Sequence, residues 1–198
     1  MKGRAHRGLC TSLWQEAAMF VAKQLADAVT WGRALIAVML FWLGFSAGAS
    51  GLPWAVALML LAWTADSVDG ALARRSSRRY HTWIGDHDLE VDILVALGLL
   101  GYLTLSGWVS PKQAGLYLAL WALAFLFFGY VHVLGELVQA PIYGDFVWVA
   151  WRHAPSVGWL LPAWMVAAIV VTWPRFPEEK VKGFLQEMAE FLGRASRR

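Results

Sequence analysis

Long apolar runs alternate with short polar segments along most of this chain. The clearest apolar runs cover about 31–48, 54–74, 86–106, 113–132 and 157–173. Each run is close to the ~20 residues that an α-helix needs to cross a bilayer. The pattern therefore predicts an all-α integral membrane protein with at least five transmembrane helices.

The region 133–152 is ambiguous, because polar residues interrupt it: Glu136, Gln139, Pro141 and Asp145. Charge placement decides how it is interpreted. Of the 17 Lys and Arg residues, 15 fall in three blocks, namely the N-terminal arm through Arg33, the segment Arg74–Arg79 and the tail from Arg175. An even number of crossings puts all three blocks on the cytoplasmic side, as the positive-inside rule requires. We therefore predict a short or broken fifth helix at about 137–151 and six transmembrane helices in total.

The two ends of the chain lie outside this bundle. Residues 12–29 show the pattern of an amphipathic helix, which would lie on the membrane surface or pack on the domain as an ordinary soluble helix. The tail is also amphipathic. The sequence thus divides into an N-terminal cytoplasmic arm with an amphipathic helix at 1–30, a six-helix domain at 31–173 and a cytoplasmic amphipathic tail at 174–198.

Composition supports the membrane interpretation. The chain is 59% hydrophobic and 16% charged, whereas soluble domains are about 45–50% apolar and about 25% charged. The basic residues flank apolar spans and no nucleic-acid-binding motif accompanies them, so we expect no nucleic-acid partner. The single cysteine, Cys10, excludes an intramolecular disulfide.

Four carboxylates stand where the second and third spans meet: Asp66, Asp69, Asp88 and Asp92. A carboxylate costs roughly 2.5–3.5 kcal/mol at the centre of a membrane helix, so such residues indicate function. Residues three, four or seven apart share a helix face, and the spacing makes the four converge from two neighbouring helices. Oxygen-only ligands favour Mg²⁺ or Mn²⁺. Two such ions can stabilise an in-line displacement at phosphorus.

Small and basic residues adjoin these carboxylates. Gly70 and Ala73 lie on the same predicted face as the first two aspartates, and they leave room for a bulky ligand against the helix backbone. Arg74 beside them can bind phosphate through two parallel hydrogen bonds. Arg78 and Arg79 would attract the phosphate of an acceptor, or serve only as charges that set the topology.

This spacing resembles the signature of the CDP-alcohol phosphatidyltransferases of class I, which are integral membrane enzymes of phospholipid synthesis with six transmembrane helices. The resemblance is carried by Asp66-x2-Asp69-Gly70-x2-Ala73-Arg74, then Gly85, then Asp88-x3-Asp92. Thr30-x2-Arg33 also resembles the family pattern in the first span. The resemblance implies a homodimer in the cell (inner) membrane, with its active site facing the cytoplasm.

The resemblance also implies a role for each matching residue. Asp66, Asp69 and Asp88 would hold the two metal ions, and Asp92 would partly coordinate them and act as the general base. The residues expected to bind the CDP group are Thr30, Asp66, Gly70, Ala73 and Arg74. The implied reaction transfers a phosphatidyl group from CDP-diacylglycerol to a small polar alcohol and releases CMP.

The second half of the motif departs from the family pattern. Two residues separate Gly85 from Asp88, where the family usually has three. A local displacement of the glycine explains this, and it leaves Asp86 and Glu90 as an alternative pair of ligands. We favour Asp88 and Asp92.

Glycerol 3-phosphate is our first choice of acceptor, as in phosphatidylglycerophosphate synthases, because the predicted cytoplasmic end of the site is rich in arginine. The alternatives are inositol phosphate or another polar alcohol. A hypothesis from a different class is a non-catalytic membrane protein that binds or transports cations. Such a protein needs polar residues through the bilayer, and the first, third and fourth spans contain almost none.

Overall fold

The computed structural model describes residue 24 and residues 28–75, 88–173 and 181–195, with side chains described except at 69–75, 88 and 194–195. Helices account for nearly all of these ranges, and the described residues contain no strand. The elements, in chain order, are the helix Ala28–Ser46, η1 (Gly48–Gly51), α2 (Leu52–Arg75), α3 (Asp88–Leu105), α4 (Pro111–Phe128), α5 (His132–His153), α6 (Pro155–Gly158), α7 (Leu160–Thr172) and α8 (Lys182–Ala195).

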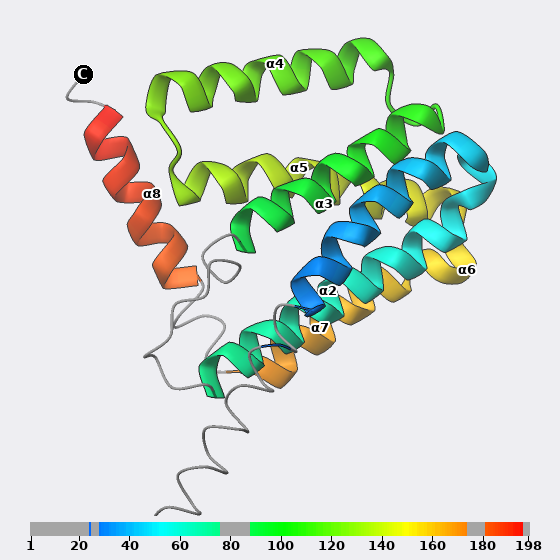
Figure 1. The fold of residues 1–198 in the computed structure, drawn as a ribbon, viewed down its shortest axis with the longest axis horizontal. Helices are drawn as coiled ribbons and strands as arrows, with labels where there is room; N and C mark the ends of the chain where they lie inside the picture. The colour runs from blue at the N-terminus through cyan, green and yellow to red at the C-terminus, as the bar shows by residue number, and fades with distance from the viewer. Residues whose placement is uncertain (1–23, 25–27, 76–87, 174–180, 196–198) are drawn as a thin grey trace, which may run out of the picture.

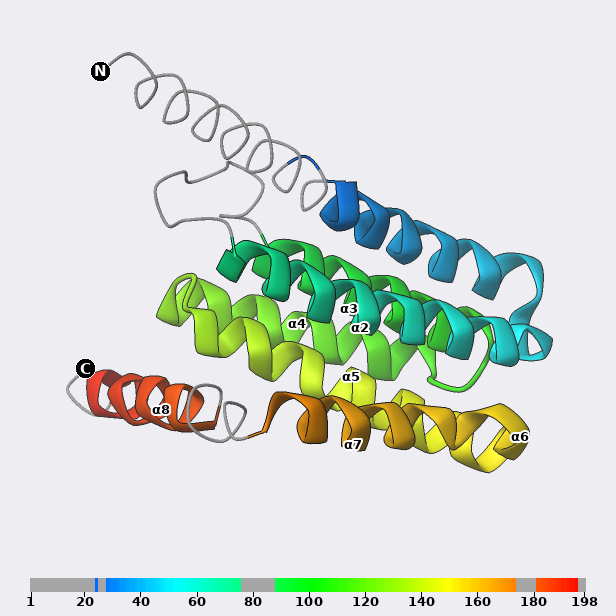
Figure 2. The ribbon, with the colours of Figure 1, turned by 90° about the horizontal axis from the view of Figure 1, so that it is seen from below.

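The long helices run side by side and alternate in direction along the chain (Figures 1 and 2). We call the end that holds Ala28, Arg75 and Asp88 the proximal end. The opposite, distal end holds η1, the turn between α3 and α4, and α6. The connections at the distal end are short, so each helix there reverses directly into its antiparallel neighbour.

Four segments among the described residues are long and apolar enough to cross a membrane: Ala28–Ser46, Gly48–Val68, Pro111–Phe128 and Pro155–Thr172. The prediction of an all-α membrane protein is therefore confirmed at this level. The helices α3 and α5 carry more polar residues, and they also contribute many of the buried side chains of the bundle. In contrast, α4 and α7 are largely exposed around their circumference.

Turn residues explain where the spans begin and end. Ser110 caps α4, since its hydroxyl accepts a hydrogen bond from the Gln113 backbone N–H, and the Ser110 backbone N–H donates in turn to Gln113 Oε1. The helix ends at Phe128 because Gly129 has φ +77°, a left-handed value that suits glycine. The fourth apolar run was predicted to continue to His132, so it ends one turn earlier than expected.

The fifth helix is longer than predicted. We expected a short or broken helix at 137–151, whereas α5 is assigned as one helix from His132 to His153 with Pro141 inside it. Proline is tolerated where neighbouring helices surround the backbone. Gln139 is buried within α5 and its Nε2 donates to the Gly135 carbonyl 2.9 Å away. Of the four residues that interrupt the apolar run, Gln139 is buried, Glu136 is half-buried, and Pro141 and Asp145 are exposed.

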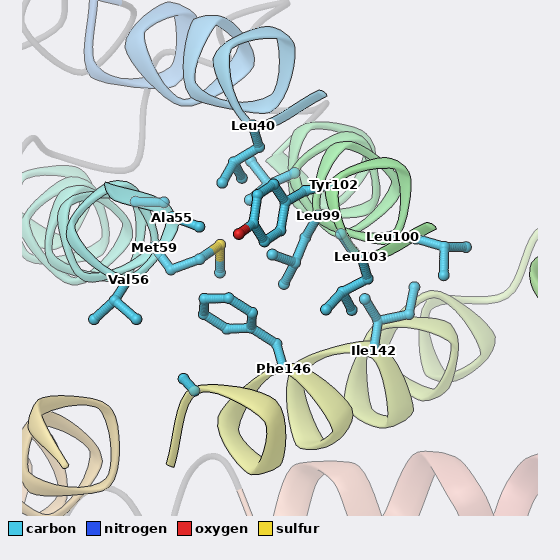
Figure 3. Close-up of a cluster of buried hydrophobic side chains, with 14 of the residues drawn as sticks. Leu40, Ala55, Val56, Met59, Leu99, Leu100, Tyr102, Leu103, Ile142 and Phe146 are labelled. Carbon is cyan, nitrogen blue, oxygen red and sulfur yellow. The ribbon is translucent and has the colours of Figure 1, made fainter. Parts of the chain in front are cut away.

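The hydrophobic core lies between the helix Ala28–Ser46, α2, α3 and α5. Figure 3 shows side chains from these four helices converging in the interior, among them Leu40, Met59, Tyr102 and Phe146. Each of these four is fully buried. Their packing fixes the rotation of each helix, and that rotation decides which polar residues face inward at the proximal end.

The predicted amphipathic tail is present as α8, which Figure 1 shows lying across the proximal end beside α4. Its Phe191 ring packs edge-on to Phe128 at the end of α4, with centroids 5.0 Å apart. Glu187 Oε2 lies 3.2 Å from His132 Nδ1 at the start of α5. The predicted amphipathic helix at 12–29 falls almost entirely outside the described residues.

Candidate functional site

Arg33 joins three helices at the proximal end. It lies on the helix Ala28–Ser46, and its Nη1 is 3.2 Å from Asp66 Oδ1 of α2. Its Nη2 contacts Asp92 Oδ1 of α3. The first and last carboxylates of the motif therefore meet on one guanidinium group. We call Arg33, Asp66 and Asp92 the charged triad.

Helix periodicity explains why these three side chains face inward. Leu40 follows Arg33 by seven residues, Met59 precedes Asp66 by seven, and Leu99 follows Asp92 by seven. All three apolar residues are fully buried in the core. Seven residues are about two helical turns, so each charged residue shares a face with the core residue two turns below it. The packing that buries the core thus also brings the triad together.

The triad is buried on one side and open on the other. The Arg33 side chain is 1% exposed, whereas those of Asp66 and Asp92 are 48% and 30% exposed. The carboxylates therefore keep part of their surface accessible from outside the bundle. Asp92 is the fifth residue of α3, close to the positive end of the helix dipole, which favours a negative charge there.

The helix α5 contributes a polar contact beneath Asp92. The Tyr143 hydroxyl lies 3.5 Å from the Asp92 backbone carbonyl and 3.3 Å from Gln139 Oε1. Arg33 and Asp66 are both near enough to act electrostatically on this hydroxyl. Tyr143 thereby ties the backbone of the α3 carboxylate to α5.

Aromatic rings border this contact. Trp63 of α2 stands edge-on to the Tyr143 ring at a centroid distance of 5.7 Å, and it lies 5.6 Å from the Trp164 ring of α7. The Trp164 Nε1 donates to Thr64 Oγ1 at 3.0 Å. The rings join α2, α5 and α7 next to Asp66, so the position of this carboxylate is fixed by packing on several helices.

The remaining predicted site residues are described only in part. The helix α2 continues through Arg75, so Asp69, Gly70, Ala73 and Arg74 lie on helical backbone toward the proximal end, one to two turns beyond Asp66. Asp88 is the first residue of α3, one turn before Asp92. The side chains of these five residues fall outside the description. Thr30 is 4% exposed and one turn before Arg33, whereas Arg78, Arg79, Gly85 and Asp86 lie outside the described residues.

The structure describes one side chain from each of the two ligand pairs that the sequence left open, Asp92 and Glu90. Asp92 faces Arg33 and Asp66. Glu90 is exposed and interacts instead with the Tyr130 side chain, in the connection between α4 and α5. Glu90 therefore points away from the charged triad. The side chains of Asp86 and Asp88 lie outside the described residues, so the choice between the two pairs stays a prediction.

The donor chemistry of the triad fits a hard divalent cation in part. Asp66 and Asp92 supply oxygen ligands from two helices, and a positive charge already lies against both. Within the described side chains, no group of three or more His, Cys, Asp or Glu residues is arranged to hold a metal. The described pair therefore supplies two of the four expected ligands, and a complete site requires Asp69 and Asp88.

Three residues of this site were not predicted from the sequence. Arg33 was recognised only as part of a pattern in the first span, and no role was predicted for Gln139 or Tyr143. The last two stand one turn apart within a membrane-length helix, and this spacing of two polar side chains is the signal that could have identified them. The bridging role of Arg33 depends on tertiary packing, which no local pattern reveals.

Comparisons of the chain with models of protein families, with curated proteins and with solved structures give no match.

Proposed function

We propose that this chain is an integral membrane phosphatidyltransferase. It would transfer a phosphatidyl group from CDP-diacylglycerol to a small polar alcohol and release CMP. The observation that carries the proposal is the meeting of Asp66 and Asp92 on one guanidinium, from two different helices. A two-metal transferase needs the first and last carboxylates of its motif at one place, and this packing supplies that.

The proposal includes six membrane crossings with the proximal end in the cytoplasm. The helix α3 has 18 residues and α5 has 22, which corresponds to about 27 and 33 Å of helix. The helix α3 runs antiparallel to α2 and α4, and α5 runs antiparallel to α4 and α7 (Figure 2). Gln139 of α5 is buried, and Asp92 of α3 is paired with Arg33. Six crossings also keep all three basic blocks on one side of the membrane.

In this mechanism Asp66, Asp69, Asp88 and Asp92 would hold two Mg²⁺ or Mn²⁺ ions. Bound metal would neutralise the phosphate charge that develops as CMP leaves. Asp92 would accept the proton of the acceptor alcohol as its oxygen attacks phosphorus. The partial exposure of Asp92 suits this role, since the general base must be reached by the acceptor.

The nucleotide would bind along the α2 backbone toward the proximal end. Gly70 and Ala73 have little or no side chain, and they follow Asp66 by one and two turns. Arg74 beside them would bind phosphate, with Thr30 on the neighbouring helix. This location lets the acyl chains of CDP-diacylglycerol remain in the bilayer while the nucleotide stays in water.

We take glycerol 3-phosphate as the acceptor, because Arg78 and Arg79 would favour a phosphorylated alcohol. Inositol phosphate has the same chemistry and is the alternative. A panel of acceptors in one assay separates these two from uncharged alcohols.

The competing proposal is a cation transporter. A transporter needs a polar path from the site to the other side of the membrane. Two turns below the charged triad, the interior is occupied by Leu40, Met59 and Leu99, all fully buried. This apolar layer argues for a one-sided site, as an enzyme of the cytoplasmic face requires.

The test is CMP release by the purified protein in lipid nanodiscs that contain CDP-diacylglycerol, with Mg²⁺ or Mn²⁺ and the panel of acceptors. Release that depends on both metal and acceptor supports the proposal. Absence of CMP release with glycerol 3-phosphate, inositol phosphate, inositol, serine and glycerol would overturn it.

A further inference from the structure

Arg33 is a charged residue whose side chain is almost completely shielded from solvent. Its side chain is 1% exposed, and its helix is among the segments apolar enough to cross a membrane. Burying a guanidinium costs several kcal/mol unless carboxylates or other acceptors compensate it. Asp66 and Asp92 supply that compensation. These two carboxylates therefore contribute to the stability of the buried Arg33.

The two carboxylates in turn are stabilised by Arg33. Asp66 and Asp92 belong to different helices, and two carboxylates at one place repel each other. Arg33 gives each of them a positive partner in an ion pair. One guanidinium against two carboxylates leaves a net charge of −1, so the triad still attracts a further cation.

We propose that Arg33 is a built-in counter-ion, which holds Asp66 and Asp92 together in the metal-free protein and competes with divalent metal for them. Arg33 is thus a positioning residue, and it lowers the metal affinity of the site while it stabilises the empty site. The part of this proposal that concerns metal rests on the proposed function. The part that concerns the metal-free protein stands on the contacts alone.

The first experiment measures the thermal unfolding of the protein in EDTA. Arg33→Gln should lower the unfolding temperature by on the order of 10 °C, because it leaves two carboxylates without their buried partner. Asp92→Asn in the Arg33→Gln background should recover most of that loss, because it removes the charge repulsion. Arg33→Lys keeps the positive charge but lacks the planar guanidinium group, so its unfolding temperature should fall between those of the wild type and Arg33→Gln.

The control is Arg152→Gln, because Arg152 is an exposed arginine at the distal end of α5. It should change the unfolding temperature little, with or without Asp92→Asn. If Asp92→Asn destabilises the Arg33→Gln protein further instead of rescuing it, Arg33 acts by shape and not by charge, and the counter-ion proposal is overturned.

The second experiment titrates Mn²⁺ and follows its binding by electron paramagnetic resonance, together with the increase in unfolding temperature. Arg33→Gln should bind Mn²⁺ at least about tenfold more tightly than the wild type, because a positive charge next to the ligands has been removed. The increase in unfolding temperature should be larger as well. Arg33→Lys should stay closer to the wild type.

The outcomes distinguish the two proposals. If Mn²⁺ binds the wild type and binds Arg33→Gln equally or more weakly, the competition proposal is wrong and the metal site stands. If Mn²⁺ binds none of these proteins, the proposed function is wrong, and the rescue in EDTA still decides whether Arg33 is the counter-ion of the two carboxylates.

Discussion

Gly98 of α3 lies against the backbone of Ala37, so closely that a β-carbon on Gly98 would stand 2.8 Å from the Ala37 α-carbon. Ala37 follows Arg33 by one turn on the same helix. The close approach of the two backbones is therefore part of what lets Arg33 reach Asp92. A glycine that is remote from the chemistry thus sets the geometry of the charged triad.

Gly98→Ala should destabilise the protein by about 1–3 kcal/mol, because the added methyl group must push two helices apart. The matched control is Gly115→Ala in α4, where a β-carbon would meet nothing within 4 Å. That substitution should be neutral or stabilising by up to about 1 kcal/mol, since alanine favours helix. Thermal unfolding followed by tryptophan fluorescence measures both. Equal effects at the two positions would contradict the close contact.

Asp92→Asn should lower the rate of CMP release by about 100- to 10,000-fold, the usual contribution of a general base. Asp66→Asn should have a comparable effect through the loss of a metal ligand. Glu90→Gln is the control, because Glu90 lies only two residues from Asp92 and interacts with Tyr130. Its rate should stay within about twofold of the wild type. Substantial activity in Asp92→Asn or Asp66→Asn would refute the mechanism.

The alignment of the second half of the motif has its own test. Asp88→Asn should abolish metal-dependent CMP release, and Asp86→Asn should not, because Asp88 stands one turn before Asp92 on α3. The same assay measures both. Loss of activity at position 86 with retention at position 88 would shift the ligand set to Asp86 and Glu90, and it would contradict the orientation of Glu90 in this structure.

The six-crossing topology predicts which residues face the two sides of the membrane. Single cysteines at Lys112 and Arg152 should react with a membrane-impermeant maleimide from the outside of intact cells, and one at Lys182 should not. Cys10 is replaced by serine in all of these variants. Labelling of Lys182 together with Lys112, without labelling of Arg152, would show that the number of crossings is odd, and the tail would then lie outside.

Much of the fold could be predicted from hydropathy alone, because four of the five apolar runs match segments of the described residues that are long and apolar enough to cross a bilayer, and the third run matches the helix α3. The fifth helix could not. Glu136, Gln139 and Pro141 lower its hydropathy, and only the packing of α3, α4 and the core around it explains why it forms one helix over 22 residues. Helix ends such as Phe128 depend on the backbone of a single glycine.

The candidate site also has features that the sequence predicts and features that depend on tertiary packing. The shared face of Asp66 and Asp69, and that of Asp88 and Asp92, follow from helical spacing in the sequence. The contact of Arg33 with Asp66 and Asp92 does not, since it joins three helices whose relative rotation is fixed by core packing. Tyr143 was missed for the same reason, because its contact with the Asp92 carbonyl is tertiary.

The apolar layer of Leu40, Met59 and Leu99 beneath the charged triad also has an electrical consequence. With hydrocarbon below the site, ions that arrive or leave at the proximal end would traverse almost none of the transmembrane voltage. The layer acts as an insulator, so that nucleotide and metal traffic at the site would neither dissipate a proton gradient nor respond to the membrane potential.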